Sequence, residues 1–147
     1  DHARTFIIEN SSDEVKKKLI SVADKALEIG IKNSVSGNRI GVLSNAIEEF
    51  VLNEGFDVVR EYVGHGIGSA LHEPPSVPNF GKKDEGALLR VGMTIAIEPM
   101  VTEGKWQTKV MNDDWTIVTK DGKLSSHSED TILITENGPE VLTKSSN

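Results

Sequence analysis

Residues 64–75 read Gly-His-Gly-Ile-Gly-Ser-Ala-Leu-His-Glu-Pro-Pro, the most unusual stretch in this chain of 147 residues. Three glycines within five residues let the backbone turn sharply and approach a ligand closely, which neither a packed strand nor a packed helix requires. The two histidines, His65 and His72, would then be available for binding. A glycine-rich surface loop with two solvated histidines is the alternative, and this stretch alone leaves both interpretations open.

The residues that follow Gly55 favour strands. Apolar and β-branched runs separated by glycine, proline and aspartate occupy 56–62, 93–101, 115–119 and 131–135. Such short runs between turn residues are typical of β-structure. A further short run at 5–8 predicts a strand that ends in a polar loop.

The residues before Gly55 favour two helices. Apolar residues at near-helical spacing predict one helix from about Asp13 to Ile29, preceded by a capping-box pair, Ser11 and Glu14, and a second helix that Gly55 closes. The two apolar faces consist of Val15, Leu19, Val22, Ala26, Leu27 and Ile29, and of Ile40, Leu43, Ala46, Ile47, Phe50 and Val51. Helices first and strands later predict an α+β fold with both helices on one face of a sheet.

Composition excludes several classes of function. The chain is 37% hydrophobic and 27% charged, which suits a single globular domain. It has no cysteine, so any metal must be held by imidazole and carboxylate groups. Its net charge of -7 and the lack of a lysine and arginine cluster argue against nucleic acid as the main partner. No apolar run approaches the roughly 20 residues of a membrane-spanning helix, and no secretory signal follows Asp1.

Three acidic residues stand at predicted strand ends. Glu98 interrupts the apolar run 93–100 immediately before a proline, and Glu129 opens the run that leads into 131–135. Burying an ionised carboxylate costs several kcal/mol unless a cation or hydrogen bonds compensate, so a paired or metal-bound role is the economical explanation. The alternatives are an edge-strand glutamate that points to water and, for Asp1, a solvated terminal residue.

Together with one histidine these acids form a plausible metal-ligand set. Asp1, His65, Glu98 and Glu129 offer one imidazole and three carboxylates, a combination that suits Mn, Fe(II), Co or Zn. Several carboxylates around one imidazole favour a pair of divalent cations that share oxygen ligands. We expect His2 and His127 in solvent or at the rim of the site, and the serines near His127 in a polar turn.

At this point the sequence resembles a known family, the type I methionine aminopeptidases of the pita-bread fold. The resemblance covers nearly the whole chain and rests on several motifs in order. They are residues 1–6, Glu-Gly-Phe at 54–56, Arg-Glu-Tyr-Val-Gly-His-Gly-Ile-Gly at 60–68, His-Glu-Pro at 72–74, Gly-Met-Thr at 92–94, Ile-Glu-Pro-Met at 97–100, Asp-Trp-Thr at 114–116 and Glu-Asp-Thr at 129–131.

The resemblance implies a role for each candidate residue. Asp1, His65, Glu98 and Glu129 would be four of the five protein ligands of a dinuclear centre, with Asp1 and Glu129 bridging the ions. Glu98 would also carry a proton during hydrolysis. His72 would contact the substrate at the scissile carbonyl, and Tyr62, Leu71 and Trp115 would lie near the N-terminal methionine. Leu71 departs from the family, because bacterial members often carry an aromatic residue there.

The resemblance also implies that this is the C-terminal half of a two-part fold. In the family a fifth ligand, an aspartate, precedes the position of Asp1, and the active site lies between two α/β halves. Residues 1–143 would be the C-terminal half of the catalytic domain and residues 144–147 a polar tail. We therefore expect an exposed sheet edge and apolar surface that the missing half covers, either within a longer chain or as a separate chain, and little activity from this chain alone.

The implied function is removal of the N-terminal methionine from peptides and nascent proteins, in the cytoplasm. A prolidase or Xaa-Pro aminopeptidase would share the fold and ligands, but usually differs around the histidine loop and lacks Asp-Trp-Thr at 114–116. A type II methionine aminopeptidase would need a long insertion between His72 and Glu98, which is absent. A non-catalytic binding module of the same fold would commonly have lost the ligands.

Overall fold

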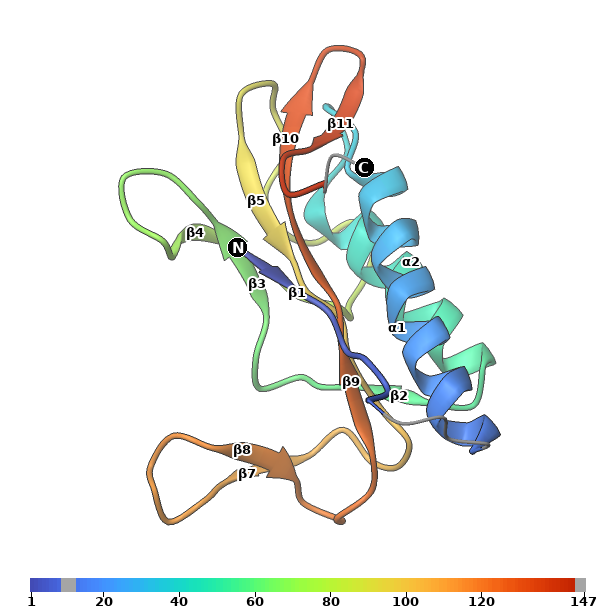
Figure 1. The fold of residues 1–147 in the computed structure, drawn as a ribbon. Coiled ribbons are helices and arrows are strands. Elements are labelled where there is room, and N and C mark those ends of the chain that lie inside the picture. The colour runs from blue at the N-terminus through green and yellow to red at the C-terminus, as the bar shows by residue number, and fades with distance from the viewer. Residues whose placement is uncertain (9–12, 145–147) are drawn as a thin grey trace.

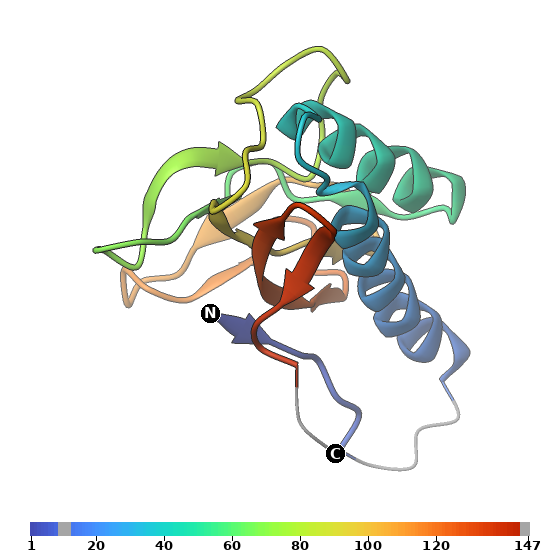
Figure 2. The same cartoon turned by 90° about the horizontal axis from the view of Figure 1, so that it is seen from above.

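Two helices pack against one face of a twisted antiparallel sheet (Figures 1 and 2). The structure is a computed structural model that describes residues 1–8 and 13–144. The helices are α1 (Glu14–Asn33) and α2 (Ile40–Asn53). The larger sheet has the order β1-β10-β5-β3-β4, with β11 paired to β10. Its strands are β1 (His2–Ala3), β3 (Gly64–Gly66), β4 (Glu73–Val77), β5 (Thr94–Ile97), β10 (Glu129–Thr135) and β11 (Gly138–Val141).

Two smaller sheets complete the described part of the chain. One contains β2 (Asp57–Val58), β6 (Met100–Thr102) and β9 (Ser125–His127) in the order β2-β6-β9. The other is a hairpin of β7 (Thr108–Val110) and β8 (Ile117–Thr119), which projects from the body of the molecule at the bottom of Figure 1.

The predicted helical faces form most of the core. Leu19, Val22, Ala26 and Leu27 of α1 and Ile40, Leu43, Ile47 and Val51 of α2 are buried. They pack with the inner face of the sheet, whose buried residues include Ile95, Ile97, Ile132 and Ile134. Gly55 has φ +85°, a conformation that glycine adopts without steric cost, and so it follows α2 as predicted. Val15, by contrast, lies exposed at the first turn of α1.

The start of α1 differs from the prediction in its cap. Asp13 is the N-cap residue, and its side chain accepts hydrogen bonds from the backbone amides of Val15 and Lys16. The helix begins at Glu14 and extends to Asn33, four residues beyond the predicted end. The predicted partner in the capping box, Ser11, lies outside the described residues, as do residues 145–147 of the predicted polar tail.

Two neighbouring segments, 94–102 and 125–135, each run from one sheet into the other, and their crossing points lie next to each other. Residues 94–97 belong to the larger sheet and residues 100–102 to the smaller one, with Glu98 and Pro99 between them. Proline cannot donate to a strand ladder, which explains why the predicted strand 93–101 divides there. The partner segment divides at Ser128, between β9 and β10. This junction positions Glu98 and Glu129 side by side.

The other strand predictions need two corrections. The predicted strand at 5–8 is wrong, because the strand that pairs with β10 is His2–Ala3 and residues 4–7 are irregular. The β-rich runs 56–62 and 115–119 contain only the short strands β2 and β8. In both runs the apolar pattern is present, but only the residues that lie beside another strand form backbone hydrogen bonds with it and become a strand.

The described residues expose considerable apolar surface. Ile8 is 99% exposed, Phe6 79% and Trp115 86%. The strand β1 lies at one edge of the larger sheet, where it pairs with β10 alone. Neither helix in residues 13–144 is both long and apolar enough to cross a membrane.

Replacing Ser128 by alanine tests the junction between the sheets. The buried Ser128 Oγ donates a hydrogen bond to Asp24 Oδ1 of α1 at 2.6 Å. Because hydrogen bonds to charged groups contribute about 1.5–3 kcal/mol, Ser128→Ala should lower the free energy of unfolding by about that amount in urea denaturation. The buried Ser126 Oγ has no hydrogen-bond partner, so Ser126→Ala should cost little. Equal losses for both variants would contradict this.

Candidate metal centre

His65 presents one bare nitrogen to a group of carboxylates. It lies on β3, buried between β4 and β5, and its Nδ1 is 3.0 Å from the carbonyl oxygen of Gly66. A carbonyl oxygen only accepts, so Nδ1 carries the proton and Nε2 keeps a free lone pair. That Nε2 lies 3.7 Å from Glu98 Oε1 and 4.0 Å from Asp1 Oδ2. The ring is therefore oriented as a metal-binding histidine is in proteins.

Glu98 and Glu129 meet at the junction between the two sheets. Ligand atoms of His65, Glu98 and Glu129 all lie within 4.8 Å of one another. Burial, and then the charge of Glu129, raise the pKa of Glu98 to about 7. Burial also raises the pKa of Glu129, against the opposing effect of nearby positive charges. Two neighbouring carboxyl groups whose pKa values are both raised by burial form a place where a cation would be stabilised.

A buried network fixes Asp1 beside this cluster. Strand β1 pairs with β10, so that Ala3 lies opposite Glu129. Asp130 Oδ1 accepts hydrogen bonds from His2 Nδ1 at 2.9 Å and Thr143 Oγ1 at 2.7 Å, and Oδ2 accepts one from Arg4 Nη2 at 2.6 Å. Burial raises the pKa of Asp130, but the hydrogen bonds from Thr143, Arg4 and His2 hold it below its ordinary value.

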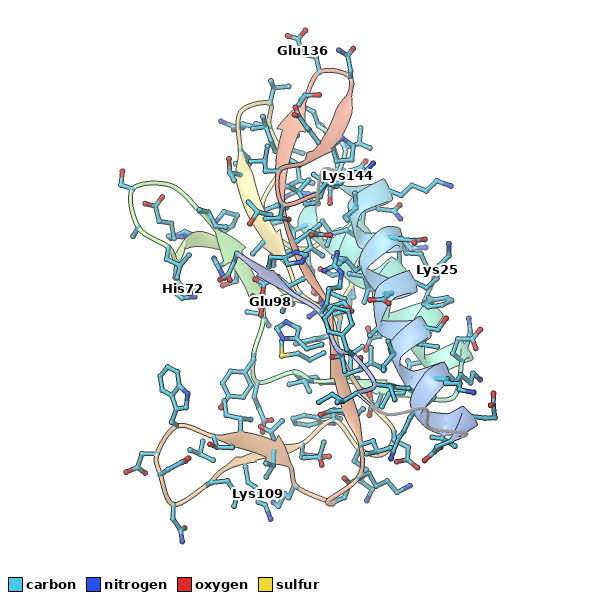
Figure 3. All side chains as sticks on the ribbon, in the orientation of Figure 1. Lys25, His72, Glu98, Lys109, Glu136 and Lys144 are labelled. Atoms are coloured by element: carbon cyan, nitrogen blue, oxygen red, sulfur yellow. The ribbon has the colours of Figure 1, made fainter. Side chains whose placement is uncertain are left out.

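His72 stands next to His65 on the other side of the cluster. The two ring centroids are 4.2 Å apart with the planes at 61°. Ligand atoms of Asp1, His65 and His72 also lie within 4.8 Å of one another. His72 itself is exposed, at the end of the loop that joins β3 to β4. Figure 3 shows His72 and Glu98 on the side of the sheet away from the helices, with Lys25 of α1 pointing outward on the other side.

The three predicted substrate-binding residues lie in different surroundings. Tyr62 lines a pocket of about 320 Å³ together with Glu98 and His127. Leu71 and Trp115 are exposed, and among the described residues no ring contact or hydrogen bond joins either side chain to the cluster. Another pocket, of about 860 Å³, lies between residues 4–7 and the two helices and is lined by none of the predicted site residues.

His127 is a site residue that the sequence interpretation placed in solvent or at the rim. Its Nε2 is buried and lies 3.8 Å from Glu98 Oε2 and 4.0 Å from Glu129 Oε2, and it makes no hydrogen bond to residues 1–8 or 13–144. Burial and the charge of Arg4 lower the pKa of His127. The signal was present in the sequence, because residues two apart on an extended strand share a face and His127 precedes Glu129 by two.

These residues fit a divalent metal centre. All donors are imidazole nitrogen or carboxylate oxygen, the set that Mn, Fe(II), Co and Zn accept. The distances between donors agree with ions about 2.1 Å from each ligand, since two ligands of one ion then lie about 3–4.2 Å apart. Metal-ligating histidines commonly donate their other nitrogen to a carbonyl, as His65 does.

Comparison with known proteins agrees with the chemistry of this cluster. The profile of metallopeptidase family M24 matches residues 1–136, so the chain belongs to this family. The methionine aminopeptidase of Clostridium perfringens is 49% identical over 143 residues, which are 97% of this chain and 57% of that protein. A methionine aminopeptidase structure from Thermotoga maritima superimposes with a TM-score of 0.95 and 51% identity, over 98% of this chain and 57% of the other.

A proline-directed member of the same family is less similar. The prolidase of Pyrococcus horikoshii OT3 superimposes with a TM-score of 0.72 and 26% identity, over 99% of this chain and 36% of its own. The predicted fold, two helices on a curved and mainly antiparallel sheet of the pita-bread kind, is confirmed. The chain spans little more than half the length of the methionine aminopeptidases that it matches.

Proposed function

We propose that this chain is part of an aminopeptidase that removes the N-terminal methionine from peptides and nascent proteins by metal-dependent hydrolysis. The observation that carries the proposal is that His65 belongs to two overlapping groups of nitrogen and oxygen donors, one with Asp1 and His72 and one with Glu98 and Glu129. The names and the high identity of the methionine aminopeptidases support this substrate. The lower similarity to the prolidase weighs against the proline-directed alternative.

Asp1, His65, Glu98 and Glu129 would hold two divalent ions. When bound, such ions lower the pKa of a shared water toward 7 and polarise the peptide carbonyl. Cobalt, manganese, iron(II) and zinc all suit the donors. The retained ligands argue against a non-catalytic binding module.

The side chains around the cluster would transfer the proton, stabilise the oxyanion and bind the substrate. Glu98 would carry the proton from the attacking water to the leaving amine, since burial and the charge of Glu129 raise its pKa to about 7, where a carboxyl group can both accept and release a proton near neutral pH. His72 is exposed and adjacent to His65, and it donates a hydrogen bond to the oxyanion that forms at the scissile carbonyl. Tyr62, Leu71 and Trp115 form the wall of the methionine pocket on this side.

A second part of the fold completes the site. We infer that residues 1–143 are the C-terminal half of the catalytic domain, because the chain spans 57% of its relatives. The exposed apolar side chains of Phe6, Ile8 and Trp115 and the edge strand β1 support a covering partner, either the rest of a longer chain or a separate one. Action on nascent chains would place the protein in the cytoplasm.

The test is hydrolysis of a Met-Ala peptide with added Co(II) or Mn(II). The purified chain should show little activity alone and should gain it when mixed with a separately produced segment that supplies the rest of the fold. Glu98→Gln in the mixture is the control and should abolish the gain. A natively folded mixture without activity would contradict the proposal, and preferential cleavage of an Xaa-Pro peptide would favour the proline-directed alternative.

A further inference from the structure

We propose that Asn79 is a positioning residue of the metal centre and sets the place of Glu98 by holding its backbone carbonyl oxygen. The inference rests on the proposed metal centre and extends it, because Asn79 acts through Glu98 and is not a ligand itself. Asn79 stands in none of the motifs that define the candidate site. The inference assigns a role to a buried amide that the proposed hydrolysis does not otherwise use.

The backbone at Glu98 lies where strand pairing is interrupted. Residues 94–97 pair with β10, and residues 100–102 pair with β9. Glu98 and Pro99 belong to neither ladder. Proline has no backbone N–H to donate, and the residue before a proline is confined to extended conformations. The position of the Glu98 backbone therefore depends on hydrogen bonds other than those of a strand ladder.

The carbonyl oxygens of residues 98–100 each accept a hydrogen bond from a different segment. Those at positions 99 and 100 accept from the backbone amides of Ser128 and Val59, at 3.3 and 3.0 Å. The carbonyl oxygen of Glu98 accepts instead from a side chain, Asn79 Nδ2, at 3.1 Å. A substitution at position 79 can therefore remove this donor and leave the other two in place.

Asn79 connects the strand that carries His65 to the junction that carries Glu98. It is fully buried and lies two residues after β4, which pairs with the strand of His65. That strand pairs with β5 at Gly66 opposite Ile95, three residues before Glu98. The hydrogen bond from Asn79 adds a connection at Glu98 itself. It therefore helps to set the distance of 3.7 Å between His65 Nε2 and Glu98 Oε1.

Packing alone does not explain an amide at position 79. The Oδ1 atom of Asn79 is buried and has no hydrogen-bond partner within residues 1–8 and 13–144. Leaving a buried polar atom unsatisfied is unfavourable, and an apolar side chain of similar shape would avoid that cost. The bond to the Glu98 carbonyl is the one hydrogen bond that this side chain makes within the described residues. The donor is thus the part of the amide that the structure uses.

The first test compares two asparagines by Zn(II) calorimetry on the full chain. Asn79→Ala should weaken Zn(II) binding by roughly tenfold or more, because partners that orient a metal ligand typically contribute about 10–100-fold to affinity. Asn45→Ala is the matched control. Asn45 Nδ2 also donates to a backbone carbonyl oxygen, that of Gly81 at 3.2 Å, and its Oδ1 also lacks a partner in the described part of the chain. Asn45 lies on α2, so its loss should change Zn(II) affinity by less than about twofold.

The second test separates a displaced ligand from a general loss of stability. Co(II) is added in place of Zn(II), and its visible absorption bands report the geometry of the bound ion. Lost stability alone would scale these bands, whereas a displaced Glu98 carboxylate would change their shape. We expect a changed shape in Asn79→Ala and the original shape in Asn45→Ala. Asn79→Leu, which keeps the branching at Cγ but cannot donate, should behave as Asn79→Ala does and replaces it if the alanine variant does not fold.

The outcomes distinguish this inference from the proposed metal centre. Unchanged zinc affinity and an unchanged Co(II) spectrum in a folded Asn79 variant would overturn the inference and leave the metal centre standing. Equal weakening of zinc binding in Asn79→Ala and Asn45→Ala would also overturn it, because the effect would then follow from lost stability. If the unaltered chain binds neither Zn(II) nor Co(II), the metal centre and the inference both fail.

Discussion

Gly66→Ala is expected to unfold the β3–β4 region and abolish metal binding with it. A Cβ atom at Gly66 would lie 2.8 Å from the carbonyl carbon of Pro74 and 2.9 Å from the backbone oxygen of Glu73. These are backbone atoms of the neighbouring strand β4, and they cannot move without breaking the ladder that holds His65. We expect a loss of about 3 kcal/mol or more in the free energy of unfolding, measured by urea denaturation.

Gly68→Ala, two residues along the same loop, separates this effect from a general intolerance of alanine. The three nearest atoms to a Cβ atom there belong to the partly exposed side-chain carboxylate of Glu73, which can rotate away at the cost of one hydrogen bond from the Ala70 amide. We expect a loss below about 1 kcal/mol and retention of metal binding. If the two variants are equally destabilised, the close approach of β3 and β4 does not explain the glycine at position 66.

This contrast also corrects the interpretation of the glycine-rich stretch. The sequence predicted that its glycines let the backbone approach a ligand. At Gly64 and Gly66 the close neighbours are instead the adjacent strands, since added Cβ atoms would meet backbone atoms of Ala96 and Pro74. The glycines allow β3 to lie tightly between β4 and β5. These two glycines therefore position His65 through close strand packing, and the approach of a ligand to this stretch stays a prediction.

The helices could be predicted because their signals are local. An apolar stripe at 3.6-residue spacing and a glycine after α2 depend on neighbouring residues only, and Leu19, Leu27, Leu43 and Ile47 are buried as expected. The end of α1 at Asn33 was missed, because the last turn contains polar residues that carry no apolar period. The strand positions were less accurate, because a strand exists only where a partner lies beside it.

The site residues stay a prediction, and the structure shows how they are arranged. Asp1, His65, Glu98 and Glu129 stand in motifs with distinctive local chemistry, and the structure brings them together. His127 and Asp130 gain their positions from contacts across the sheet, such as His2 with Asp130, that are 128 residues apart in sequence. The alternation of a strand places His127 with Glu129, whereas nothing local shows that Asp130 is buried as well.

Asp130→Ala is the second substitution with a large expected effect. Its buried carboxylate accepts hydrogen bonds from Arg4, His2 and Thr143, and so it ties β1 and the C-terminal residues to β10. Removing it leaves the guanidinium of Arg4 without its charged partner. Hydrogen bonds to charged groups contribute about 1.5–3 kcal/mol, and because Arg4 and His2 are partly exposed we expect a loss of about 2–3 kcal/mol in the free energy of unfolding. Glu28→Ala, which removes an exposed pair with Lys25, should cost under about 1 kcal/mol.

Asp130→Ala should also weaken metal binding, although Asp130 is not a proposed ligand. Asp1 lies beside His65 because β1 is paired to β10. Asp130 stabilises that pairing through its hydrogen bonds with His2 and Arg4. We expect Asp130→Ala to weaken Zn(II) binding by about 10–100-fold, measured by calorimetry at a temperature where the variant is still folded. If the variant is destabilised but binds zinc as tightly as the unaltered chain, then either Asp1 is not a ligand or β1 reaches the site without Asp130. Asp1→Asn decides between these outcomes, since it removes charge from the proposed ligand and leaves the strand pairing in place.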